Sequence, residues 1–139
     1  MNDKRAAFLS ALIGQPWAHD RSCWHVAALV QATLFGRQLP HVDVPPDPSW
    51  RWMIDTIERH PEHANWAEVV APLVGLVTAG DGALVALARV DRAAHIGVWL
   101  AAERLVIHCD QDFGIVAQDI ATLRAGGWGR IRFYEPVTD

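Results

Sequence analysis

Cys23 and two histidines, His95 and His108, could together carry out nucleophilic chemistry. Cys23 opens the apolar run 24–36, and a thiol at a helix N-terminus lies at the positive end of the helix dipole, which favours the thiolate. A histidine within reach can accept the thiol proton and later return it to a leaving group. A second polar residue can fix the tautomer of that histidine. These residue types therefore predict a cysteine hydrolase.

The spacing of the histidines predicts a β-hairpin that brings them together. Segment 95–108 is typical of two short strands joined by a turn. A loop at 101–102 or at 100–103 sets His95 directly opposite His108, where cross-strand side chains touch. The longer loop is favoured, because two alanines are poor chemistry for a two-residue turn. A one-residue slip would destroy both this pairing and the apolar face behind it. The same register pairs Leu105 with Val98 and Ile107 with Ile96.

The elements around these residues follow an α+β order, with helices first and a sheet later. Helices are predicted at 4–13, 23–35, 49–59 and 64–70. Strands are predicted at 83–89, 96–100, 104–109, 114–117 and 129–134, with a helical turn at 119–124. Gly36 is expected to end the second helix, and Asp47 with Pro48 to begin the third. Segment 40–49 holds four prolines and is expected to be an irregular connector.

Composition limits the classes of protein that fit. The 139 residues suit one domain, 1–139, and the hydrophobic fraction of 51% with 20% charged residues is typical of a globular protein. A net charge of −4 without a Lys/Arg cluster gives no footprint for nucleic acid. No apolar run reaches the ~18 residues of a membrane span, so no membrane insertion is expected. Residues 6–13 are short and periodic, which predicts a first helix and a protein made in the cytoplasm without a signal peptide.

The remaining reactive or aromatic residues favour structural roles. Cys109 would point away from His108, toward the core, as a small buried residue. His60 and His63 are three residues apart with a proline between them, which favours a helix–helix turn over a metal site, so no metal or other cofactor is expected. Trp99 is expected to pack near the catalytic elements. Core packing and an exposed docking surface both remain open for Trp50, Trp52, Trp66 and Trp128.

Several segments, taken in order, resemble NlpC-type cell-wall cysteine peptidases. The segments at the entry are IGQPW at 13–17 and SCW at 22–24. Those of the sheet are GDGALV at 80–85, HIGVWL at 95–100 and VIH at 106–108. The tail IRFYEP at 131–136 is similar to the closing strand of members encoded near phage tail-tip genes.

This resemblance implies a papain-like α+β domain with N-terminal helices packed on an antiparallel sheet. It implies that Cys23 is the nucleophile, His95 the base and His108 the orienting residue. The residues that border the substrate are expected to be Trp17, Ser22, Trp24 and His25. The implied reaction is hydrolysis of an amide bond in peptidoglycan stem peptides, without a cofactor. The implied setting is a virion component at a phage-like tail tip, with tail-tip or hub proteins as partners.

Three positions differ from the family's usual pattern. Ser22 stands where an acidic residue is usual, His25 where a small one is usual, and Trp17 where tyrosine is usual. These differences keep open a structural or adaptor protein that retains the fold after its site has decayed. A cysteine amidase or acyltransferase acting on a small amide or a lipid is a further alternative.

Overall fold

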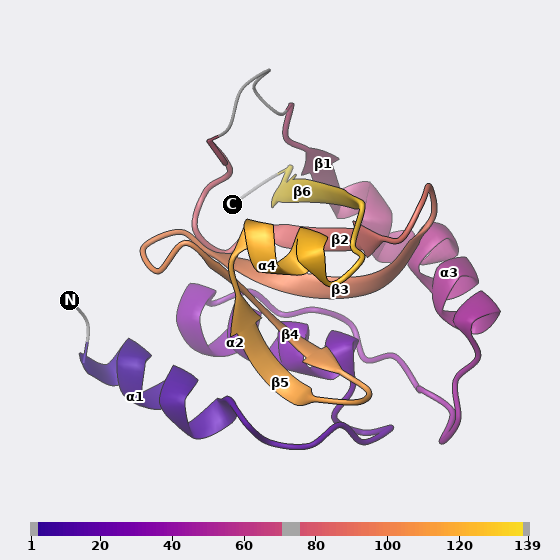
Figure 1. Cartoon of the computed structure of the whole chain (residues 1–139), viewed down its shortest axis with the longest axis horizontal. Helices are drawn as coiled ribbons and strands as arrows, with labels where there is room; N and C mark the ends of the chain where they lie inside the picture. The colour runs from indigo at the N-terminus through magenta and orange to yellow at the C-terminus, as the bar shows by residue number, and fades with distance from the viewer. Residues whose placement is uncertain (1–2, 71–75, 138–139) are drawn as a thin grey trace.

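The described residues form helices and strands in the α+β order predicted from the sequence (Figure 1). A computed structural model describes residues 3–70 and 76–137. The helices are α1 (Asp3–Leu12), α2 (Cys23–Phe35), α3 (Trp50–Arg59) and α4 (Ile120–Ala125), with the short 3-10 helix η1 (Pro61–Asn65). The strands are β1 (Trp66–Glu68), β2 (Leu84–Ala88), β3 (Ala93–Leu100), β4 (Leu105–Asp110), β5 (Gly114–Gln118) and β6 (Arg130–Pro136).

The strands form one antiparallel sheet in the order β1-β6-β2-β3-β4-β5. Strands β2 to β5 follow each other as neighbours, and β6 returns to the free edge of β2. Strand β3 is central and is buried along nearly its whole length. The histidine hairpin therefore lies in the middle of the sheet rather than at an edge.

Helices cover both faces of this sheet, as Figure 1 shows. Leu84 and Val85 are neighbours on β2 and belong to two different core clusters. Since neighbouring residues on a strand point to opposite faces, the two clusters lie on opposite faces of the sheet. The cluster around Leu84 includes residues of α1 and α2, and the cluster around Val85 includes Leu123 of α4 and Trp128. Helix α3 packs against β3.

Helix α2 begins and ends where the sequence predicts. Cys23 is its first residue and Phe35 its last. Gly36 adopts the left-handed conformation with φ 65°, which a residue without a side chain reaches at no steric cost, and this conformation ends the helix. Helix α3 also lies where expected, but its cap is different. The Ser49 side chain accepts a hydrogen bond from the Trp52 N–H at 3.0 Å, so Ser49 is the N-cap in place of Asp47.

The helix predicted at 64–70 is wrong. Residues 61–65 form η1, and β1 follows at once. Trp66 pairs with Pro136 and Glu68 with Tyr134, so a strand from the middle of the sequence pairs with one near its end. The partner strand is about seventy residues away, so a local pattern of apolar residues could not reveal that pairing. The helix predicted at 64–70 would have ended at Val70, which is the last described residue before the gap at 71–75.

The register predicted for the histidine hairpin is shifted by two residues. Leu100 pairs with Leu105, so the loop is 101–104, and Arg104 in this loop has a positive φ of 59°. His108 lies opposite Gly97 instead of opposite His95. A shift of two residues keeps every side chain on its face, because the strand period is two. The two histidines therefore still share a face, as diagonal rather than direct neighbours.

No helix in the described ranges is both long and apolar enough to cross a membrane.

Candidate active site

The N-terminus of α2 is fixed by a cap that involves His25. Ser22 is the N-cap residue and is buried, with only 4% of its surface exposed. The Ser22 hydroxyl donates to His25 Nδ1 at 2.8 Å, and the Ser22 N–H approaches the same nitrogen at 3.4 Å. His25 thus occupies the place that Glu or Gln takes in a capping box. His25 does not line the pocket described below, whereas Trp17, Ser22 and Trp24 do.

The segment before Cys23 is attached to the end of the β4–β5 hairpin. Gly14 N–H donates to the Ile115 carbonyl and Ile115 N–H donates to the Gln15 carbonyl, both at 2.9 Å. The buried Cys109 thiol donates to the Arg21 carbonyl at 3.3 Å. Burial raises the pKa of Cys109 to about 12, so Cys109 is the inert core residue that the sequence predicts. These contacts hold the chain at Gly14 and Gln15 against β5 and at Arg21 against β4.

The Cys23 thiol is desolvated, and this burial raises its pKa above the ordinary value. Hydrogen bonds from the backbone N–H groups of Ile96, Trp24 and Cys23 itself act in the opposite direction but are smaller. The expectation that the helix dipole favours a resting thiolate is therefore corrected, since desolvation outweighs it. The sulfur therefore lies beside Ile96 of β3, on the face of the sheet that α2 covers. His95 precedes Ile96 on the same strand and points to the opposite face, where it pairs with Leu87 and is stacked on Trp128.

His95, His108 and Gln118 form one chain of hydrogen bonds. His95 Nε2 lies 2.8 Å from His108 Nδ1, and His108 Nε2 lies 2.7 Å from Gln118 Oε1. The amide oxygen of Gln118 can only accept, so His108 Nε2 carries the proton. A neutral His108 then accepts at Nδ1, and His95 donates from Nε2. The Nδ1 atom of a neutral His95 consequently carries the free lone pair.

Both histidines are held neutral. Burial lowers the pKa of His95 well below the ordinary 6.5, and the nearby His108 and Arg89 lower it further. Burial also lowers the pKa of His108, although the contact with Gln118 acts against this. The neutral state is the one that the assignment of donors and acceptors along the chain requires.

An aromatic stack fixes the plane of the His95 ring. Trp128 is stacked on His95, with ring centroids 5.3 Å apart and planes 10° apart. Trp50 is stacked in turn on Trp128 at 6.2 Å and 12°. The guanidinium of Arg89 lies 3.9 Å from the centroid of the Trp128 ring. Trp128 is buried, whereas Trp50 is 48% exposed, so the stack runs from the histidine to the surface.

Gly97 makes room for the histidine pair. A Cβ atom at this position would lie 2.7 Å from Val106 Cγ1 and 3.2 Å from His108 Cβ. Both distances are shorter than ordinary contacts between carbon atoms. The close approach of β3 and β4 at His108 therefore requires a residue without a side chain.

Cys23 and His95 line the same pocket, which has a volume of about 220 Å³. No hydrogen bond joins the Cys23 thiol to either histidine in the described structure. His95 Nδ1 has no hydrogen-bond partner, yet within the described ranges only Trp99 Nε1 is both unpartnered and fully enclosed. His95 Nδ1 therefore has access to open space, although its ring lies on the other face of the sheet from the Cys23 thiol.

Two contributions to this site were not found from the sequence. Gln118 reaches His108 because β5 pairs with β4, with Val116 opposite His108 and Gln118 two residues further on. A strand at 114–117 was predicted, and pairing it with the preceding strand would have pointed to Gln118. Trp128 follows a two-glycine turn more than thirty residues after His95, and no local pattern connects the two.

The other predicted features fall in several places. Trp66 and Trp99 are buried in the core, and Trp52 lines the pocket. His60 Nδ1 accepts the Glu62 N–H at 3.1 Å and so begins η1, which fits the predicted turn. Within the described ranges, no group of three or more His, Cys, Asp or Glu side chains could hold a metal ion.

Comparison with known protein families, with curated proteins and with solved structures gives no match for this chain.

Proposed function

We propose that this chain is a cysteine hydrolase with an NlpC-type, papain-like domain, and that it cleaves an amide bond. The observation that carries the proposal is the chain from Gln118 through His108 to His95, which leaves a free basic nitrogen on a residue that lines the same pocket as Cys23. A nucleophile, a base and a residue that orients the base are the parts that covalent acyl transfer needs. Their order along the sequence is the one that the resemblance implies.

The raised pKa of Cys23 and the lowered pKa of His95 define the resting state as a neutral thiol and a neutral imidazole. His95 Nδ1 takes the thiol proton as Sγ attacks the carbonyl carbon of the amide. The imidazolium then gives this proton to the departing amine as the C–N bond breaks. Water loses a proton to His95 as it attacks the thioester, and the C–S bond breaks to release the acid and restore the thiol.

The developing oxyanion needs hydrogen-bond donors beside Cys23. The Cys23 N–H is one donor, because the first N–H groups of a helix have no partner within the helix. Trp17 lines the same pocket, and its Nε1–H donates no hydrogen bond within the described ranges. We assign the second donor to Trp17 Nε1, in place of the tyrosine hydroxyl that is usual at this position in the family.

The substrate and the biological setting come from the resemblance. The proposed substrates are peptidoglycan stem peptides, and the proposed setting is local cell-wall degradation by a virion component at a tail tip. Tail-tip or hub proteins are the proposed partners. No cofactor takes part in the proposed mechanism.

A structural or adaptor role is the second candidate, and both the state of Cys23 and its position on the other face of the sheet from His95 favour it. A thiol with a raised pKa and without a hydrogen bond to a histidine is less reactive than an activated one. Under this alternative the pocket and the fold remain, and turnover is absent.

The deciding experiment measures the release of amines from peptidoglycan fragments and the mass of the protein after reaction with 4-nitrophenyl acetate. Cys23→Ala is expected to abolish both turnover and the acetyl adduct, and His95→Ala to abolish turnover. His108→Ala is expected only to weaken turnover, because His95 keeps its basic nitrogen. Cys109→Ala is the matched control and should retain both signals. Equal activity of the wild type and Cys23→Ala would contradict the proposal.

A further inference from the structure

The pocket beside Cys23 is walled by apolar and aromatic side chains from several elements. Helix α3 and the connector before it supply one part of this wall, and the sheet with Trp17 and Trp24 supplies the rest. The side chains of α3 and the connector are Val42, Val44, Pro48, Trp50, Trp52, Met53 and Ile57. A wall of this kind gains free energy by removing apolar ligand surface from water.

Several polar atoms of the wall are already paired within the protein. Trp24 Nε1 donates to the Pro40 carbonyl at 2.8 Å. Trp66 Nε1 donates to Glu62 Oε2 at 2.8 Å, and the Thr56 hydroxyl donates to the Trp52 carbonyl at 2.7 Å. These side chains therefore present their apolar parts to the pocket.

Three of the four Asp, Glu and Arg side chains on the wall are engaged in the same way. Glu62 accepts from Trp66 and also from the Asn65 amide. Arg89 donates to the Gly126 carbonyl and lies over the Trp128 ring. Asp110 Oδ1 accepts the backbone N–H groups of the following turn, and Asp112 in that turn is exposed. A charged ligand group would lose its hydration here without gaining an unengaged buried partner.

The connector before α3 separates the two kinds of side chain. Val42 and Val44 line the pocket, whereas His41 and Asp43, which alternate with them along the chain, are exposed. His41 and Asp43 form a pair at 2.7 Å on the solvent side. The alternation makes the inner surface of this irregular segment apolar and leaves its charges in water.

From this arrangement we infer that the acyl part of the substrate is uncharged and apolar, with an aliphatic or aromatic group next to the scissile amide. The inference rests on the proposed function and narrows its substrate class. A γ-glutamyl group, which carries charges beside the amide, is the poor substrate. A stem peptide is then cleaved only where the acyl side of the bond carries no charge.

Binding to Cys23→Ala tests the inference without a need for turnover. The probes are N-methyl octanamide, N-methyl phenylacetamide and the N-methyl amide of γ-glutamate, measured by titration calorimetry. The two apolar amides are expected to bind at least about tenfold more tightly than the γ-glutamyl amide, as burial of several CH₂ groups or a ring implies. Equal binding of all three, or preference for the γ-glutamyl amide, would overturn the inference. The ratio between the two apolar amides distinguishes an aliphatic from an aromatic acyl group.

A charge placed in the wall provides a second test. Val44→Asp, made in the Cys23→Ala protein, is expected to weaken binding of the better apolar amide at least about tenfold, because the carboxylate takes water into the pocket. Val90→Asp is the matched control: Val90 is 76% exposed and does not line the pocket, so binding should not change. Unfolding temperatures of both variants show whether each still folds. Unchanged binding in a folded Val44→Asp variant contradicts the inference.

Two further readouts separate this inference from the proposed function. Alkylation of Cys23 by iodoacetamide, with and without His95→Ala, reports the cysteine–histidine pair and needs no acyl group. Loss of the histidine dependence with intact binding of the apolar amides means that the proposed function fails and the apolar specificity stands. Histidine-dependent alkylation with a preference for the γ-glutamyl amide means that the proposed function stands and the apolar specificity fails. Conversion of a dimer to a monomer by Val44→Asp would assign the wall to a second copy of the chain and overturn the inference.

Discussion

The direction of one hydrogen-bond chain decides which nitrogen of His95 can act as a base. Gln118 fixes the proton on His108 Nε2, and His108 fixes the proton on His95 Nε2. The lone pair of His95 is then on Nδ1, without a competing partner. The uncharged amide of Gln118 stabilises an imidazolium less than a carboxylate would. His95 therefore remains a weak, neutral base.

The pH dependence of turnover follows from the neutral form of His95. Because the pKa of His95 lies well below 6.5, the fraction of active, unprotonated enzyme stays high down to a lower pH than for an ordinary histidine. We expect the acid limb of kcat/KM to lie below pH 6.5. A pH series with a small uncharged amide measures it. A limb above pH 6.5 would show that His95 is not the buried base described here.

Two substitutions of Gln118 test its positioning role. Gln118→Glu keeps an acceptor and adds a charge that stabilises an imidazolium, so the acid limb should move to higher pH. Gln118→Leu removes the acceptor and should lower kcat by about tenfold, a part of the 10²- to 10⁴-fold that a positioned acid–base group contributes.

The ¹⁵N shifts of the imidazole nitrogens report the tautomers directly. Protonated Nε2 on both histidines is expected in the wild type, with mixed tautomers in Gln118→Leu. Mixed tautomers in the wild type would contradict the assignment.

At the scale of elements, the start of α2 depends on a histidine in an unusual role. His25 Nδ1 accepts hydrogen bonds from the Ser22 hydroxyl and N–H, as the Glu or Gln side chain of a capping box usually accepts one from the N-cap N–H. His25 therefore serves the helix and does not line the pocket. Cys23, the nucleophile of the proposed mechanism, is the next residue after the N-cap, so the cap also determines where Cys23 lies.

Two substitutions of similar size separate this cap from simple packing. His25→Gln can still accept from the N-cap N–H and should change the free energy of unfolding little. His25→Leu cannot accept and should destabilise the protein by about 0.5–1 kcal/mol. Urea unfolding measures both variants. An equal loss for both, or none for His25→Leu, would show that the side chain does not act as a cap.

The predicted register of the β3–β4 hairpin was wrong, but the two histidines were still placed on the correct face. The observed register differs by two residues from the expected one, and both histidines remain on one face. Gly97 then lies opposite His108 and leaves the space that the pair needs. The alternation of side chains between the two faces of a strand is visible in the sequence. This alternation mattered more for the site than the length of the loop.

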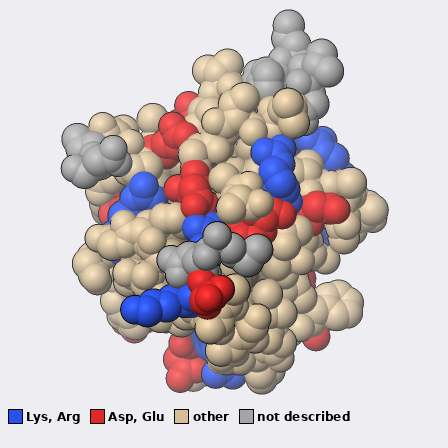
Figure 2. Space-filling model, turned by 90° about the vertical axis from the view of Figure 1, so that its left-hand side faces the viewer, with Lys and Arg blue, Asp and Glu red and all other residues tan. Residues whose placement is uncertain are grey.

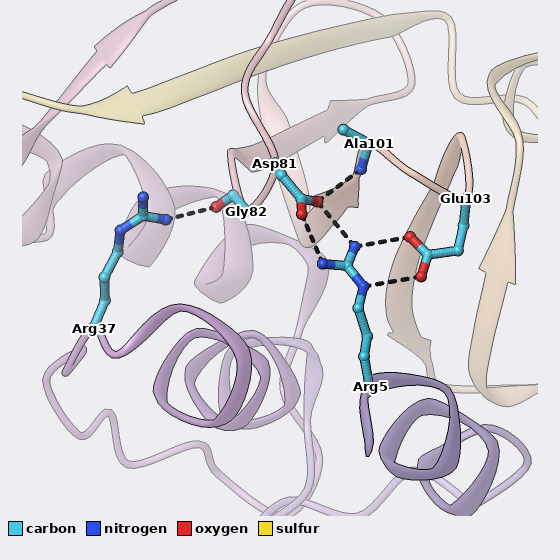
Figure 3. Close-up of polar contacts among 6 residues, drawn as sticks. All are labelled: Arg5, Arg37, Asp81, Gly82, Ala101 and Glu103. Carbon is cyan, nitrogen blue, oxygen red and sulfur yellow. Dashed lines mark hydrogen bonds and ion pairs between the residues drawn. The ribbon is translucent and has the colours of Figure 1, made fainter. Parts of the chain in front are cut away.

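Over the whole molecule, one arginine connects the first helix to the sheet. Arg5 of α1 donates to both oxygens of Asp81 at 2.6 and 2.9 Å and to both oxygens of Glu103 at 2.8 and 2.9 Å (Figure 3). Asp81 also accepts the Ala101 N–H at 2.8 Å. Nearby, Arg37 donates to the Gly82 carbonyl at 3.2 Å. The bonds of Arg5 join segments that are 76 and 98 residues apart in the sequence.

Arg5→Met should destabilise the protein by about 1 kcal/mol, a value kept small because solvent and salt screen a partly exposed network. Arg5 lowers the pKa of Asp81, so the bond contributes above the unfolded pKa of about 3.9 and is lost as the pH falls through the folded value. The difference between Arg5→Met and wild type should therefore begin to shrink below about pH 4 and disappear only below the lowered pKa of Asp81. Thermal unfolding at several pH values checks this. The control is Arg92→Met, whose pairs with Asp55 and Glu58 are exposed and should contribute less.

The charge on the surface is mixed at this scale. On the face shown in Figure 2, basic and acidic side chains lie beside one another rather than in a patch of one sign. Such a face gives no broad positive field for a polyanion. The expectation that nucleic acid is not a partner agrees with this face and remains a prediction for the molecule.

The sequence by itself determined the elements whose signals are local. Helix α2 from Cys23 to Gly36, the β3–β4 hairpin and the turn at Asp119 are specified by caps, glycines and residue alternation within a few positions. Those signals also placed His95 and His108 on one face, because alternation along a strand is a property of the backbone.

Only the tertiary structure decided the contributions that depend on distant partners. Strand β1 exists because β6 pairs with it, Gln118 completes the histidine chain because β5 pairs with β4, and Trp128 stacks on His95 from the far end of the chain. The protonation state of Cys23 was likewise settled by packing. The helix dipole is visible in the sequence, but desolvation depends on every segment that covers the thiol, and it is the larger effect.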